Sequence, residues 1–258
     1  MKEELNIALV QANLVWEYPE ANRAHLKELL EQSALADVYV LPEMFTTGFT
    51  MNASAFSETM DGTTVAWMRS LAKEKGAAIA GSMICEEQGK FYNRFVFVTE
   101  TGEVNFYNKR HTFTLVGEER VYNRGEEKVI VDYKGWRLCL QVCYDLRFPV
   151  WARNVEVYDV LLYTANWPVK RIDAWDALLK ARAIENMSYV VGVNRVGKDG
   201  NEILYNGHSA AFGVLGAPLV FSEDKEEVLV ATLNYGVLTE LRDRFKFLDD
   251  QDRFDIHV

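Results

Sequence analysis

Residues 136–149 read WRLCLQVCYDLRFP, an apolar run that turns polar at its second cysteine, Cys143. The apolar part predicts a buried β-strand, which places Cys143 where that strand meets a loop. In α/β proteins, ligands gather outside the carboxyl ends of the strands, so this position suits chemistry better than one in mid-strand. A free cysteine is nevertheless most often a buried packing residue. The residues that could activate the thiol therefore decide its interpretation.

The composition indicates a globular protein with a sizeable core. The chain has 258 residues, of which 49% are hydrophobic and 26% are charged, and we expect a single domain over residues 1–258. Its net charge of -10 repels phosphate backbones and anionic lipid heads, so neither nucleic acid nor a membrane is expected as a partner. The acidic segment 1–6 resembles neither a secretory signal nor a membrane span. We therefore expect a cytoplasmic protein whose three cysteines are thiols.

Strand-like and helix-like segments alternate along the whole chain and predict an α/β fold. Apolar runs typical of strands occur at 5–12, 37–41, 77–85, 91–99, 104–109, 129–131, 136–142, 159–164, 189–193, 208–215 and 228–233. Segments with helical periodicity or capping signals occur at 20–34, 63–75, 149–155, 174–187 and 237–247. The pattern occurs twice, before and after about residue 125, which favours two sheets covered by helices over one doubly wound sheet. Long loops are expected at 44–60 and 110–127, followed at the end of the chain by an aperiodic acidic tail, 248–258.

Three of the predicted strands lead to residues that suit nucleophilic catalysis. Glu43 follows the strand at 37–41, Lys109 closes the strand at 104–109, and Cys143 follows the strand at 136–142. A thiol needs a base to become a thiolate, and a buried thiolate needs a nearby cation. Each residue alone also has an ordinary structural interpretation, Glu43 as a helix cap and Lys109 as a solvated strand end. The hypothesis therefore depends on the combination.

The segments around these residues resemble, in the same order, the signature segments of the nitrilase, or carbon-nitrogen hydrolase, superfamily. They read LPEMF at 41–45, YNKRH at 107–111 and VCYDLRFP at 142–149. Two later segments, 181–186 and 206–209, are also similar to family segments, so the resemblance covers nearly the full chain. Within the family, the KRH and CYDLRFP details are most similar to the ω-amidase branch.

The resemblance implies a catalytic triad of Glu43, Lys109 and Cys143, with a second glutamate in the loop after the lysine. That residue is most similar to Glu118, since the seven-residue spacing to Gly125 agrees with the family pattern, although the neighbouring Glu119 is the alternative. The implied fold is a four-layer α-β-β-α sandwich, a single domain with two similar halves that pairs through helices into a homodimer.

The implied chemistry is amide hydrolysis through a thioester, without a cofactor or a metal ion. Glu43 would take the thiol proton as Cys143 attacks the carbonyl carbon. The Lys109 ammonium and a backbone N–H, that of Tyr144, would hold the oxyanion. Glu43 would then activate the water that hydrolyses the thioester, while Glu118 orients Lys109 and Glu43.

The ω-amidase resemblance implies a short α-keto acid with a terminal amide as the substrate, such as 2-oxoglutaramate or 2-oxosuccinamate. The substrate carboxylate needs a local cation because an unpaired charge in a closed pocket is costly. Arg147 and Arg171 are the candidates, with Arg195 less favoured. The candidate aromatic walls of the pocket are Phe45, Phe49, Phe113 and Trp167.

Other functions stay open at this point. The same triad would suit an amidase for another small linear amide, including a methionine-salvage keto amide, a nitrilase or an N-carbamoyl hydrolase. A catalytically silent interaction protein on this fold is the non-enzyme alternative. Cys139 and Cys143 lack a second ligand pair for zinc. No histidine lies in a cysteine-protease motif, and we expect His111 to be a structural hydrogen-bonding residue.

Overall fold

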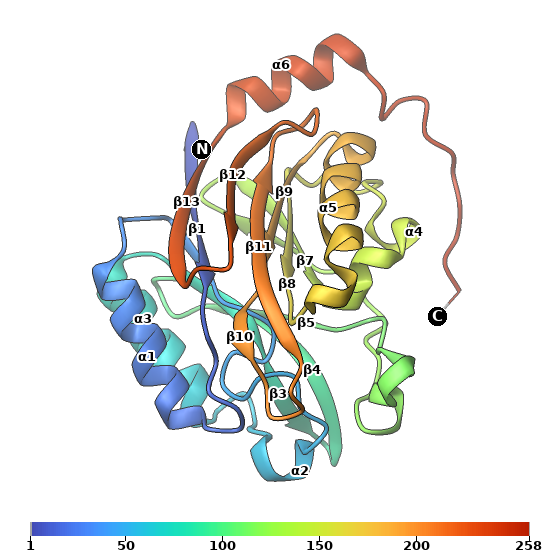
Figure 1. Cartoon of the computed structure of the whole chain (residues 1–258). Helices are drawn as coiled ribbons and strands as arrows, with labels where there is room; N and C mark the ends of the chain where they lie inside the picture. Colours follow the sequence, from blue (N-terminus) through green and yellow to red (C-terminus); the bar gives the residue numbers. More distant parts are fainter. Residues whose placement is uncertain (1, 258) are drawn as a thin grey trace.

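The computed structural model describes residues 2–257, in which two β-sheets pack face to face between two layers of helices (Figure 1). This is the four-layer α-β-β-α arrangement expected from the sequence, so the fold-class prediction is confirmed. The predicted domain limits, 1–258, include Met1 and Val258, which lie outside the described residues. Among the helices that the structure describes, none combines the length and the apolar content needed to cross a membrane.

The first sheet has six strands in the order β13-β1-β2-β3-β4-β5. β1, β2 and β3 are parallel neighbours, and the remaining pairs are antiparallel. The helices α1 and α3 cover its outer face (Figure 1). The elements of this half are β1 (Glu4–Gln11), α1 (Pro19–Gln32), β2 (Val38–Val40), α2 (Ala53–Phe56), α3 (Thr63–Lys75), β3 (Ala78–Glu87), β4 (Lys90–Val98), β5 (Val104–Asn108) and β13 (Glu227–Asn234).

The second sheet has the order β10-β11-β9-β8-β7-β6, with β12 paired to β11. Here β7, β8 and β9 are the parallel neighbours, and α5 covers the outer face. Its strands are β6 (Ile130–Tyr133), β7 (Trp136–Val142), β8 (Val160–Thr164), β9 (Tyr189–Val193), β10 (Val196–Lys198), β11 (Leu204–Phe212) and β12 (Pro218–Glu223). Its helices are α4 (Pro149–Ala152), α5 (Ile172–Asn186) and α6 (Tyr235–Phe245), and the 3-10 turns are η1 (Thr114–Val116), η2 (Glu118–Arg120), η3 (Cys143–Arg147) and η4 (Val169–Arg171).

The alternation of side chains along β7 explains why both of its faces are buried. Leu138, Leu140 and Val142 belong to the core between the sheets, whereas Cys139 belongs to the core beneath α5. Successive side chains of a strand point to opposite faces, so one apolar run contributes to two cores. Each fully buried aliphatic side chain contributes roughly 1.5–3 kcal/mol by leaving water. A central strand of a sandwich is buried on both faces, and the consecutive apolar residues around Cys139 meet that requirement.

Several short elements differ from the sequence prediction. β12 was missed because it lies beside β11 with mostly exposed residues, so it lacks the apolar pattern of a buried strand. β10 and α2 have only three and four residues, too few for a periodic signal. The long loop expected at 110–127 contains the two 3-10 turns η1 and η2.

The ends of the central strands of the two sheets meet at one side of the sandwich. β2 and β8 belong to different sheets, yet the Thr164 hydroxyl at the end of β8 donates a hydrogen bond of 2.7 Å to the carbonyl of Leu41, just after β2. Residues that follow these strands are consequently brought together from distant parts of the chain. This is where the sequence predicts the functional residues.

Candidate active site

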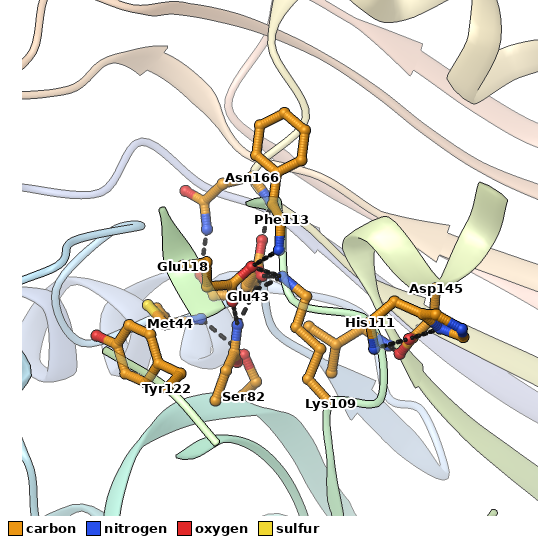
Figure 2. Close-up of polar contacts among 12 residues, drawn as sticks. Glu43, Met44, Ser82, Lys109, His111, Phe113, Glu118, Tyr122, Asp145 and Asn166 are labelled. Atoms are coloured by element: carbon orange, nitrogen blue, oxygen red, sulfur yellow. Dashed lines mark hydrogen bonds and ion pairs between the residues drawn. The ribbon is translucent and has the colours of Figure 1, made fainter. Parts of the chain in front are cut away.

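The Lys109 side chain lies between the carboxylates of Glu43 and Glu118 (Figure 2). Its Nζ is 2.9 Å from Glu43 Oε1 and 3.0 Å from both carboxylate oxygens of Glu118. Lys109 is 1% exposed, and the two glutamates are fully buried. Burial alone would lower the pKa of Lys109, but the charges of Glu118 and Glu43 outweigh it and raise this pKa. The lysine therefore remains an ammonium ion inside the protein.

Glu43 accepts hydrogen bonds from three donors that come from three different segments. Lys109 and the side-chain amide of Asn93 share its Oε1, the latter at 2.7 Å. The backbone N–H of Asn166, just after β8, donates to Oε2 at 2.8 Å, and the Asn166 side chain donates to the Glu43 carbonyl at 2.5 Å. Donors to a carboxylate favour its ionised form. These contacts hold the Glu43 side chain in one orientation at the cavity.

The second glutamate of the cluster is Glu118 and not its neighbour Glu119. Glu118 also accepts a hydrogen bond from the backbone N–H of Phe113. Burial raises the pKa of Glu118, and the charge of Lys109 opposes this shift. Glu119 instead points away, partly exposed, with its carboxylate 3.7 Å from Arg120.

Cys143 sits at the sharp turn between β7 and η3 and lines a cavity together with Glu43 and Lys109. Its φ angle of 44° is in the left-handed region, which is strained for a residue with a side chain and costs about 1–3 kcal/mol. Burial raises the pKa of its thiol well above the usual range, the charge of Glu43 raises it further, and Lys109 opposes the shift. The thiol is therefore protonated at neutral pH, so its proton has to be removed when it reacts.

Asp145 holds this strained turn against the segment that follows Lys109. Its buried carboxylate accepts hydrogen bonds from Val142 N at 3.0 Å, from the Tyr107 hydroxyl at 2.8 Å, and from His111 N at 2.9 Å. The His111 ring also contacts Asp145, with 2.8 Å between Nδ1 and Oδ1 (Figure 2). Burial and the charge of Asp145 raise the pKa of Tyr107, so its hydroxyl remains a donor. His111 makes the structural hydrogen bonds expected of it.

A cavity of about 560 Å³ opens beside this cluster. Cavities of this size suit small organic ligands. It is lined by several of the residues predicted to be at the site, namely Glu43, Phe49, Lys109, Phe113, Cys143, Tyr144, Arg147, Trp167 and Arg171.

Two of the residues considered for the pocket from the sequence lie elsewhere. Phe45 is fully buried on the helix side of the first sheet, with its ring 5.8 Å from that of Trp67 on α3. The expectation that Phe45 lines the pocket was wrong, because its side chain fills the core behind the site. Arg195 is also buried, and its guanidinium donates to the carbonyls of Leu14 and Val196.

Two arginines in the cavity lie over aromatic rings. The Arg147 guanidinium is 5.1 Å from the centre of the Trp167 ring, and that of Arg171 is 4.9 Å from the centre of the Phe113 ring. Within residues 2–257, neither arginine is in an ion pair with a carboxylate. Stacking orients a guanidinium without neutralising it. Both cations are therefore available to an anionic ligand.

Sequence reasoning missed Asn93 and Asn166 as members of the site. Asn166 carried the same signal as Glu43, because it is a polar residue just after an apolar strand. Asn93 lies within a strand, where its only signal is a polar residue in the apolar run 91–99. Neither signal shows which partner the side chain meets.

Three comparisons with known proteins agree with this geometry. A family model described as "Carbon-nitrogen hydrolase" matches residues 6–243. "Omega-amidase YafV" of Escherichia coli K12 is 45% identical over 251 residues, which cover 97% of this chain and 98% of the relative. "2-oxoglutaramate amidase" of Bacillus subtilis is 31% identical over 251 residues, 95% of this chain and 96% of the relative. The structure is also similar to the crystal structure of XC1258 from Xanthomonas campestris, described as a CN-hydrolase superfamily protein with an arsenic adduct in the active site. The two superpose with a TM-score of 0.96 and are 43% identical in sequence, and the match covers 99% of this chain and 100% of XC1258.

The Asp145 contacts predict a loss of stability when its carboxylate is replaced. Asp145→Asn keeps the size but turns an NH₂ group toward donors, so a buried N–H or O–H is left unpaired at a cost of about 1–3 kcal/mol. We expect this loss in urea unfolding. The control Asp132→Asn, on an exposed side chain of β6, should change the free energy of unfolding by less than about 0.5 kcal/mol. Coincident unfolding curves for Asp145→Asn and the parent would contradict the role of Asp145.

Proposed function

The chain belongs to the carbon-nitrogen hydrolase family, and we propose that within this family it is an ω-amidase. It hydrolyses the terminal amide of short α-keto acid amides, 2-oxoglutaramate or 2-oxosuccinamate, to the dicarboxylate and ammonia. The nearly full-length similarity to an ω-amidase and to a 2-oxoglutaramate amidase supports this substrate class. The observation that carries the chemistry is the Lys109 ammonium held by two buried carboxylates at the cavity that Cys143 lines.

The first half-reaction makes a thioester. Glu43 takes the proton of the Cys143 thiol as Sγ attacks the amide carbonyl, which avoids a free thiolate in a site that disfavours one. The Lys109 ammonium and the backbone N–H of Tyr144 stabilise the oxyanion. When the tetrahedral intermediate collapses, the C–N bond breaks, and ammonia leaves with the proton that Glu43 returns.

The second half-reaction hydrolyses the thioester. Glu43 is a carboxylate again and removes a proton from the attacking water, and Cys143 leaves as the thiol after Glu43 reprotonates it. Glu118 contacts Lys109 with both oxygens, so it orients the ammonium through both steps. One water is consumed for each amide cleaved. No cofactor is proposed for these steps.

Arg147 and Arg171 bind the carboxylate of the keto acid in this account. An anion that approaches a protein of net charge -10 needs a local cation. Both arginines line the cavity, and their stacked guanidinium groups present donors suited to two carboxylate oxygens. Phe49, Phe113 and Trp167 would enclose the carbon chain.

We further propose a cytoplasmic homodimer that pairs through its helices. The exposed apolar side chain of Ile184 on α5 supports a contact through this helix, and Leu219 and Phe221 on the strand β12 add exposed apolar surface. Sedimentation that shows only the monomer at micromolar concentrations would reject the dimer.

The proposed nucleophile predicts that Cys143→Ala abolishes ammonia release from 2-oxoglutaramate and leaves the fold intact, because a methyl group removes the nucleophile but little volume. Cys139→Ala is the matched control, on the strand β7 that leads to Cys143. Cys139 is buried in the core beneath α5 and is not among the residues that line the cavity, so its loss should leave the enzyme active. Equal turnover by Cys143→Ala and the parent would rule out the nucleophile.

The proposed carboxylate site predicts that Arg147→Met and Arg171→Met each lower kcat/KM for 2-oxoglutaramate by roughly ten- to hundredfold, the range of a hydrogen bond to a charged group. Turnover of pentanamide, a neutral amide of equal length, should change little. Arg69→Met, on the exposed side of α3, is the control and should affect neither substrate. A parent enzyme that prefers pentanamide, or does not distinguish the two amides, would overturn the keto acid assignment and leave the amidase mechanism standing.

A further inference from the structure

Asn93 on β4 contacts three members of the catalytic cluster. Its side-chain Nδ2 donates to Glu43 Oε1 at 2.7 Å and lies 3.4 Å from Glu118 Oε1. Its backbone carbonyl accepts a hydrogen bond of 2.9 Å from the backbone N–H of Lys109. We propose that Asn93 is a positioning residue. Its amide donor favours the ionised form of the base Glu43 and holds the carboxylate in one orientation. The inference rests on the proposed role of Glu43 as the base.

The position of Asn93 on β4 is one where packing alone would favour an apolar residue. Phe95 and Phe97 point to the same face of the strand and belong to the core between the sheets. Asn93 is 1% exposed and continues this row toward the strand ends. A polar side chain in such a row costs free energy unless it is fully hydrogen-bonded.

Only the nitrogen of the Asn93 side-chain amide has hydrogen-bond partners. Both groups that face its Nδ2 are carboxylates, which only accept, so the nitrogen must point toward them. Its Oδ1 is buried and has no hydrogen-bond partner among residues 2–257. An unpaired buried acceptor lowers stability. A polar side chain that lowers stability in this way is expected where it serves the site.

The hydrogen bond that Asn93 donates to Glu43 matters because the Lys109 ammonium is shared between Glu43 and Glu118. The titratable groups around Glu43 are Lys109, Glu118, Cys143, Tyr122 and Tyr205. Of these, Lys109 is the one cation, and it also holds Glu118. Burial raises the pKa of both tyrosines, so they stay neutral and add no charge near the carboxylate. Without the Asn93 donor, the Glu43 carboxylate keeps Lys109 and Asn166 N but has one hydrogen bond fewer to offset the negative charge of Glu118. Because hydrogen bonds to the charged form favour it, we expect the acid limb of the activity to move to higher pH in such a variant.

The test uses two variants of nearly unchanged size. Asn93→Leu removes the donor, and Asn93→Asp removes it and adds a negative charge beside Glu43. Two quantities are measured across pH for the whole protein: kcat and KM for the amide, and the rate at which iodoacetamide alkylates Cys143, located by mass spectrometry. The alkylation rate depends on proton transfer from Cys143 to Glu43 and needs no cleavage of an amide bond. Failure of the ω-amidase assignment can therefore be distinguished from failure of this inference.

For Asn93→Leu we expect kcat and the alkylation rate on the acid limb of the pH profile to fall by roughly ten- to hundredfold, with a small change in KM. The acid limbs of the kcat and alkylation profiles should move to higher pH by about one unit or more, and both rates should recover as the pH rises further. Asn93→Asp should move the limb further, because a like charge disfavours the carboxylate. Asn105→Leu on β5, whose side chain lies outside the site, should match the parent.

Damage to the fold alone would lower both rates at every pH and leave the acid limb in place. Circular dichroism and urea unfolding identify a variant that does not fold, in which case the other variant decides. An acid limb that coincides with that of the parent in either folded variant overturns the proposal.

Discussion

The interaction on which the site depends is the Lys109 ammonium buried between the carboxylates of Glu43 and Glu118. Charges in a protein interior carry a large desolvation cost, which is offset only when geometry and hydrogen bonds are both favourable. Two carboxylates against one ammonium leave an excess negative charge. The N–H groups of Asn93, Asn166 and Phe113 offset it as neutral donors to the carboxylates. Burial raises the pKa of Cys143 and the charge of Glu43 raises it further, so the thiol keeps its proton until Glu43 takes it.

The sandwich brings these groups together because each follows a different strand. Glu43 and Lys109 follow strands of the first sheet, whereas Cys143 and Asn166 follow strands of the second. The contact between Thr164 and Leu41 joins the two sheets at this side, and Asp145 joins the Cys143 turn to the segment after Lys109. The strained backbone of Cys143 is thus held by contacts between the two sheets. Rigid support of this kind is what proton transfer over short distances needs.

The sequence predicts much of this arrangement because strands carry a physical signal. Central strands such as β7 are apolar on both faces, and the change to polar residues at their ends marks where Glu43 and Cys143 lie. The direction of a single side chain has no such signal, which is why Phe45 was expected in the pocket and is found in the core. Asn93 was missed because its role depends on partners 50 and 25 residues away. The strand β12 was missed because it buries little apolar surface.

The central claim is that Cys143 carries the acyl group between the two half-reactions. The most direct test is the intact mass of the enzyme after acid quenching during turnover of 2-oxoglutaramate, with peptide mapping of the adduct. The account predicts an added mass equal to the substrate minus ammonia, located on Cys143 and absent from Cys143→Ala. Ammonia release at the normal rate without any acyl adduct, or with the adduct on Cys85 or Cys139, would contradict it.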